Sequence, residues 1–171
     1  DDARVLRRKN EGREVPAVLT LERLLQGNPV ICSTVLLRRT AIEQVGIFDE
    51  DPALIATEDY DLWLRLSRRE PLAYFAEPLT FYRVHDSSLS ANARFLRGVD
   101  RILDKVAADT DIDAQHRQLI ARRRADARLD VAWDHVAAGR GREARAVIRD
   151  SFAHAVTWKG CRMWARSFLG T

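Results

Sequence analysis

The sequence predicts an α+β fold in which residues 1–90 mix strands with short helices and residues 91–171 form an α-helical extension. Two observations separate the regions. All five prolines fall between Pro16 and Pro78, so only glycine can interrupt a helix after that point. Apolar residues recur three and four positions apart through most of the second region, which is the spacing of one helix face.

The first region is expected to alternate short helices with extended runs. Thr20 is a suitable N-cap for a helix that ends at Gly27. The β-branched run at residues 30–37 predicts a strand buried on both faces, within which Cys32 is expected to be a small buried side chain. A capping box that begins at Thr40 then predicts another short helix, ended by a glycine.

A longer helix is expected to begin after Thr57, its N-cap, and to end near Arg69. Two extended segments, residues 72–75 and 79–85, follow it. Alternation along the second segment places four side chains on one face of a strand: Leu79, Phe81, Arg83 and His85.

In the second region, amphipathic helices are predicted around residues 95–106, 119–136 and 144–152. We expect the joints between helices at Gly98, at the glycine-containing turn that follows the second helix, and at Gly160. Arginines and acidic residues share the opposite helix faces, which is typical of a solvated surface.

Composition narrows the classes of function. The 171 residues, 46% of them hydrophobic, suffice for an apolar core without disulfides or metals. The net charge of +3 comes from 28 basic and 25 acidic side chains in mixed order, so no nucleic-acid partner is expected. No apolar run approaches the length of a membrane span. The cysteines and the helical histidines lack the spacing of metal-ligand pairs.

Three carboxylates gather at the start of the 57–69 helix: Glu58, Asp59 and Asp61. One interpretation is that they complement the positive end of the helix dipole, which contributes about 0.3 to 1 kcal/mol for each exposed charge. The other is that a carboxylate at the mouth of a cleft acts as a general base, because it is ionised and held in place by the helix terminus. Without further context, the first interpretation is favoured.

Several short motifs supply that context, because they occur in a particular order along residues 15–90. They are Gly27-Asn28-Pro29, Val45-Gly46-Ile47-Phe48-Asp49-Glu50, Thr57-Glu58-Asp59-Tyr60-Asp61-Leu62-Trp63, Glu77-Pro78-Leu79 and Tyr82-Arg83-Val84-His85. In this order they resemble the carboxyl half of family 2 glycosyltransferases, which have the GT-A fold. The resemblance implies that residues 1–90 are the distal part of a GT-A domain, and it favours the second interpretation of the acidic cluster.

The resemblance also implies roles for individual residues. Such enzymes transfer a sugar, with inversion, from a nucleotide-diphosphate donor to an acceptor hydroxyl, and Asp59 corresponds to their general base. Glu58 and Asp61 would orient the acceptor or hold the start of the helix. Arg83 and His85 would contact the donor diphosphate, with His85 also a candidate ligand for the divalent cation, Mg²⁺ or Mn²⁺, that the intact enzyme uses.

The chain departs from the family pattern at its beginning. Relatives bind the nucleotide through an amino-terminal half that ends in an Asp-x-Asp motif, and Asp1-Asp2 lacks the intervening residue. Residues 1–14 are interpreted as the loop after that motif. We therefore expect the fragment by itself to be inactive and to bind no cation. Strands without their parallel neighbours would expose an edge, so self-association is also expected.

The resemblance places the intact enzyme in the cytoplasm, in cell-surface polysaccharide biosynthesis, with a glycan or lipid-linked acceptor. The basic, aromatic segment 158–168 either lies on an anionic membrane surface, at the inner face of the membrane, or packs on its own protein. The competing hypothesis for the whole chain is a non-enzymatic helical module that recognises a partner protein. The two hypotheses differ at Asp59, which the transferase needs at an open cleft edge beside His85.

Overall fold

The structure is a computed structural model, and it describes residues 14–81 and 92–168. The elements run in the order β1 (Val18–Leu19), α1 (Leu21–Leu25), the 3-10 turn η1 (Cys32–Thr34), α2 (Arg39–Val45), the 3-10 turn η2 (Pro52–Leu54), α3 (Glu58–Ser67), β2 (Leu72–Ala73), α4 (Asn92–Ala107), α5 (Ala114–Ala137), α6 (Gly141–His154) and α7 (Trp158–Arg166). The described residues are 62% helical with a small two-stranded sheet, so the class is α+β in the loose sense.

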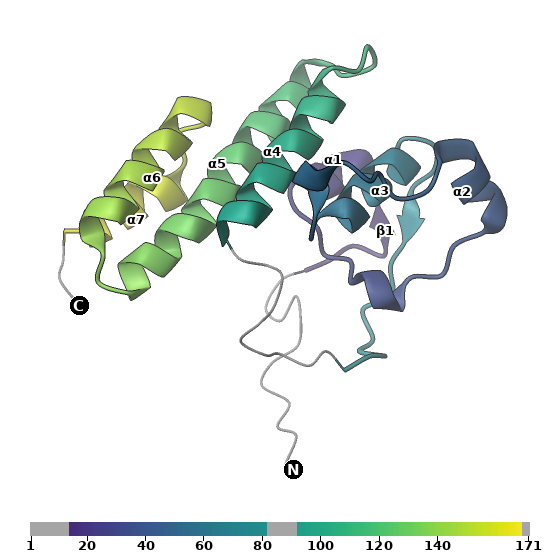
Figure 1. The fold of residues 1–171 in the computed structure, drawn as a ribbon, viewed down its shortest axis with the longest axis horizontal. Helices are drawn as coiled ribbons and strands as arrows, with labels where there is room; N and C mark the ends of the chain where they lie inside the picture. The colour runs from purple at the N-terminus through teal and green to yellow at the C-terminus, as the bar shows by residue number, and fades with distance from the viewer. Residues whose placement is uncertain (1–13, 82–91, 169–171) are drawn as a thin grey trace.

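The sheet is antiparallel, and Val18 pairs with Ala73 while Leu19 pairs with Leu72. It lies beside α1 and α3 at one end of an elongated molecule, and α6 and α7 form the other end (Figure 1). The long helices α4 and α5 lie side by side between the two ends.

A first apolar core joins the sheet, α1, α3, α4 and the first half of α5. Its centre is α3, in which Trp63 is 2% exposed and lies among fully buried side chains from the neighbouring elements. The hydroxyl of Tyr60, also on α3, donates to the carbonyl of Leu24 over 2.6 Å, so the buried phenol is satisfied. The α4 side chains Ile102 and Leu103 belong to this same core, so the predicted extension packs directly on the predicted GT-A-like region.

A second core lies between the last half of α5, α6 and α7, around Leu129 and Ile148. An ion-pair chain crosses the helices beside it. Arg128 of α5 binds Asp100 of α4 over 3.0 Å and Asp150 of α6 over 2.5 Å. α5 therefore contributes side chains to both cores, while Arg128 ties it to the helices on either side.

Most predicted helices are confirmed. Thr20 caps α1 by accepting a hydrogen bond from the Arg23 amide. α2 ends at Gly46, whose φ of 82° lies in the left-handed region that favours glycine. However, α2 begins one residue before Thr40, so the predicted capping box does not form there. The amphipathic patterns of the second region are confirmed as α4, α5 and α6.

The predicted buried strand at residues 30–37 is wrong. The segment forms only η1, and it includes Leu36, whose side chain is 97% exposed. Cys32 is exposed too, which corrects the prediction of a buried thiol. A β-branched composition creates a strand only where a neighbouring strand pairs with it, and none of the described residues does so here.

The expected joints at Gly98 and Gly160 are also wrong, because these glycines lie inside α4 and α7. Each lies at a close approach to another side chain. A Cβ on Gly98 would stand 2.2 Å from Oγ1 of Thr57, and one on Gly160 would stand 2.7 Å from the Phe152 ring. Absence of a side chain therefore lets α4 contact the start of α3.

Extended chain after β2 carries exposed apolar side chains. Phe75 and Leu79 are each 78% exposed, and Phe81 is 91% exposed. The predicted strand at 79–85 is not formed over residues 79–81, and its remaining positions, with Arg83 and His85, lie outside the described residues. No described helix is both long and apolar enough to cross a membrane.

Candidate functional site

The acidic cluster lies where η2 turns into α3. Ala56 has a φ of 72°, a left-handed conformation that costs a residue with a Cβ on the order of 1 kcal/mol. Thr57 occupies the N-cap position, as predicted, but its hydroxyl donates backwards to the Leu54 carbonyl over 2.9 Å and does not cap the helix. This tight turn fixes the direction in which α3 begins.

Glu58 and Asp59 occupy the first turn of α3, and both are partly exposed. They lie near Cys32 on η1. The pKa of the Cys32 thiol is raised by the protein atoms that displace part of its hydration shell and then by the negative charges of Asp59 and Glu58. Oε2 of Glu58 is buried and accepts no hydrogen bond from any described residue. The site therefore holds two neighbouring carboxylates and a carboxylate oxygen that can accept a proton donor.

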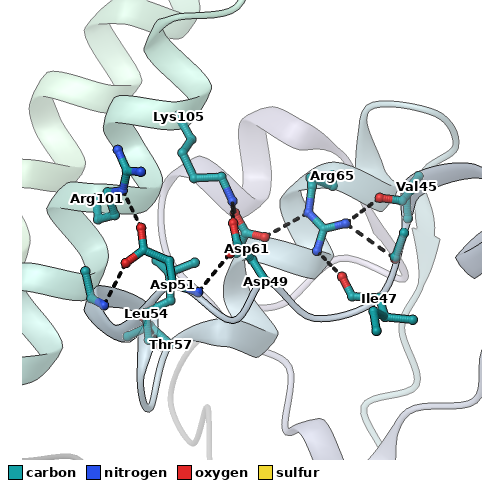
Figure 2. A network of polar contacts seen from close by, with 12 residues as sticks. Val45, Ile47, Asp49, Asp51, Leu54, Thr57, Asp61, Arg65, Arg101 and Lys105 are labelled. Atoms are coloured by element: carbon teal, nitrogen blue, oxygen red, sulfur yellow. Dashed lines mark hydrogen bonds and ion pairs between the residues drawn. The ribbon is translucent and has the colours of Figure 1, made fainter.

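Asp61 has a different environment, because its side chain is only 3% exposed and both its oxygens are engaged (Figure 2). Oδ2 accepts from Nε of Arg65 over 2.8 Å, and Oδ1 accepts from Nζ of Lys105 over 2.5 Å. Of the two roles expected for Asp61, this geometry suits holding the start of α3.

Arg65 extends the network to the loop after α2. Its Nη1 donates to the Val45 carbonyl over 2.5 Å, and its Nη2 donates to the Ile47 carbonyl over 2.8 Å (Figure 2). A planar guanidinium suits this task, since its donors point along fixed directions and bind several acceptors at once.

Lys105 and Arg101, one turn apart on α4, complete the network. Lys105 donates to Asp49 over 2.7 Å, and Arg101 donates to Asp51 over 2.8 Å. The Lys105 bond holds the pKa of Asp49 below its ordinary value, and a hydrogen bond from the Asp51 amide adds to the effect. The pKa of Asp51 is lowered first by the Ala53 amide and then by Arg101.

Two of the sequence motifs, residues 45–50 and 57–63, are thus joined side by side through Arg65, Lys105 and Asp61. Sequence reasoning missed the cationic members of this network. Lys105 is 44 positions from Asp61, and nothing in an amphipathic helix distinguishes a lysine that reaches back to an earlier segment from one that faces solvent.

The described residues do not fit the divalent cation that the resemblance implies. No group of three or more histidine, cysteine or acidic side chains in the described ranges could hold a metal ion, and the suggested ligand His85 lies outside them. His116 of α5 lies instead at 3.2 Å from Glu22 of α1.

Comparison of the chain with protein-family models, with curated proteins and with solved structures gives no match.

Proposed function

We propose that this chain is the acceptor-side part of an inverting glycosyltransferase, with Asp59 as its general base. The observation that carries the proposal is the site itself. A partly exposed pair of carboxylates stands on the first turn of α3, and a network buried at Asp61 holds that turn against the 45–50 loop. The two joined segments are among those whose sequences resemble family 2 glycosyltransferases.

The three carboxylates divide into two chemical classes. Asp61 is buried, and both its oxygens already accept hydrogen bonds from cationic groups, so neither is open to a substrate hydroxyl. Asp59 is partly exposed, and the positive end of the helix dipole favours its ionised form. A general base must be ionised and within reach of the hydroxyl it deprotonates. Asp59 meets the first requirement and has access to solvent.

In the proposed reaction, a carboxylate oxygen of Asp59 takes the proton from the acceptor hydroxyl as its oxygen attacks the anomeric carbon of the donor. A new carbon–oxygen bond forms on one face of the sugar. The bond to the nucleotide diphosphate breaks on the opposite face, and the diphosphate leaves with the bonding electron pair. Glu58 lies next to the base on the first turn of α3 and would help to orient the acceptor.

The exposed apolar run after β2 also supports the proposal. Soluble domains seldom leave several large apolar side chains exposed together without a surface that covers them. Phe75, Leu79 and Phe81 lie in that run, after the sheet that flanks α3. We assign the covering surface to a nucleotide-binding half.

The test is sugar transfer by the protein that joins this chain to a nucleotide-binding half. Nucleotide diphosphate release is measured with a panel of nucleotide sugars and glycan acceptors. Asp59→Asn should lower the transfer rate by about 10² to 10⁴-fold, the usual contribution of a general base, while donor binding and the unfolding midpoint stay unchanged. Asp111→Asn, an exposed substitution of the same kind, is the matched control.

Near-normal transfer by the Asp59→Asn variant would remove Asp59 from the mechanism. If no nucleotide sugar supports transfer by the unsubstituted protein, the proposed function fails, and the helical interaction module becomes the better hypothesis.

A further inference from the structure

A second candidate site lies between α1 and α5. A cavity of about 410 Å³ opens there, lined by Gln26, Leu119, Arg122, Arg123 and Asp126. The four α5 residues among these follow a spacing of three and four, so they form one stripe along the helix. Gln26 contributes the opposite wall from the end of α1, where its side chain is exposed.

Arg123 is the unusual member of this lining, because its side chain is charged and yet the residue is 7% exposed. Its side chain contacts the Tyr60 hydroxyl, but its Nε is buried and has no hydrogen-bond partner among the described residues. Burying a guanidinium donor without an acceptor is unfavourable, and an arginine is almost always paired when buried. A neutral hydroxyl does not balance the charge, so the Nε donor and the positive charge of Arg123 are left without an anionic acceptor among the described residues.

The side chains that line the cavity carry one more positive charge than negative charge. Asp126 lies 4.0 Å from Arg122, its neighbour one turn away on α5, and so balances that arginine. Arg123 forms no ion pair with a described carboxylate, whereas Arg124 and Arg128 on the same helix are paired with aspartates of α4. One positive charge in the lining thus lacks a counter-charge.

We propose that this cavity binds an oxyanion, a phosphate or a carboxylate group, through Arg123, with Arg122 at its rim. A guanidinium presents parallel donors that match two oxygens of such a group. The volume accommodates a group of this size together with part of the molecule that carries it. Asp59 is not among the residues that line the cavity, and the inference does not depend on the glycosyltransferase proposal.

The test is a titration of the whole chain with inorganic phosphate, followed through the arginine Nε–H signals in NMR spectra at constant ionic strength. Sodium acetate is titrated in parallel, so that the tighter ligand distinguishes a phosphate source from a carboxylate source. The Arg123 Nε–H signal should shift and saturate with one of the two anions. The exposed signals, such as that of Arg149, should show no saturable shift.

The variant Gln26→Glu separates binding from folding, because Gln26 is exposed and the new carboxylate supplies the missing acceptor at the cavity wall. It should weaken anion binding by roughly tenfold or more, the effect of losing one charge-assisted hydrogen bond. Gln44→Glu, the same substitution on exposed α2, should leave binding unchanged.

Three results would overturn the proposal. They are the absence of a saturable Arg123 shift with either anion, equal binding by the Gln26→Glu and Gln44→Glu variants, and equal saturation of the exposed arginine signals. The first means that Arg123 is a structural residue without a ligand, and the others mean non-specific attraction of anions to a basic surface.

Discussion

Replacing Asp61 by asparagine tests whether the buried network holds α3 in place. The side chain is 3% exposed, and its carboxylate receives one bond from Arg65 and one from Lys105. The asparagine oxygen can accept only one of these bonds, and its NH₂ group then faces the other cation. Arg65 keeps its backbone carbonyls, and Lys105 keeps Asp49, so the loss is close to one charge-assisted hydrogen bond. We expect unfolding to become easier by about 2 to 3 kcal/mol.

The assay is urea denaturation followed by tryptophan fluorescence, since Trp63 lies on the same helix and is buried in the first core. Asp130→Asn is the matched control. Its aspartate also pairs with a lysine, Lys159, but the two side chains are 60% and 49% exposed. Exposed pairs contribute about 0.2 to 1 kcal/mol, so the control should lose less than the Asp61 variant.

A loss below about 0.5 kcal/mol for Asp61→Asn, or equal losses for the two variants, would refute this reasoning. A double-mutant cycle with Lys105→Met adds a second criterion, because two groups in direct contact should show a coupling of about 0.5 to 3 kcal/mol. Coupling near zero would mean that the Lys105 bond contributes nothing to the network.

Three other predictions concern the site and its packing. Asp59→Asn should lower the pKa of Cys32 and so speed its alkylation near neutral pH, with Cys161 as internal control, because a neighbouring negative charge is removed; an unchanged rate would mean that the two residues are not neighbours. Lys105→Met should raise the pKa of Asp49 toward its ordinary value, as seen by carboxyl ¹³C NMR. The lowered pKa of Asp49 stabilises the folded chain above the ordinary carboxyl pKa, and this stability is lost as the pH falls through the lowered pKa. The Lys105→Met variant should therefore lose less stability on acidification than the unsubstituted chain. An Asp49 titration that does not shift in the variant would contradict the contact. Gly98→Ala should destabilise the chain by about 1 kcal/mol, since overpacking against Thr57 at 2.2 Å outweighs the gain in helix propensity; a more stable variant in a thermal melt would contradict this.

The helices were predictable because their signals are local. Thr20 and Gly46 act on bonds within their own helix, and apolar spacing reports the face that α4 or α5 buries. The run at 30–37 was misread because strand formation depends on a partner elsewhere in the chain, which composition does not reveal. The joint predicted at Gly98 fails for a related reason. The sequence does not distinguish a glycine that ends a helix from one that permits a close contact with another element.

The candidate site was predictable in part. Glu58, Asp59 and Asp61 are adjacent in sequence, so a single helix places them together. Their division into an exposed pair and a buried anchor depends on Lys105 and on the 45–47 carbonyls, which only the tertiary fold brings close. Arg123 belongs to the arginine-rich helix faces for which the sequence predicts a solvated surface, and its burial follows from the packing of α1 on α5.

The sharing of α5 between the two cores limits how the molecule can move. A helix of 24 residues spans about 36 Å. The first half of α5 packs in the first core, and its last half packs in the second core. Arg128, which forms ion pairs with both α4 and α6, lies where α5 passes from the first core to the second. A hinge between the ends would have to break the backbone hydrogen bonds of α5 or pull Arg128 from its aspartates. We therefore expect α4, α5 and α6 to move together, so that the packing of α7 at one end is linked to that of α3 at the other through α5.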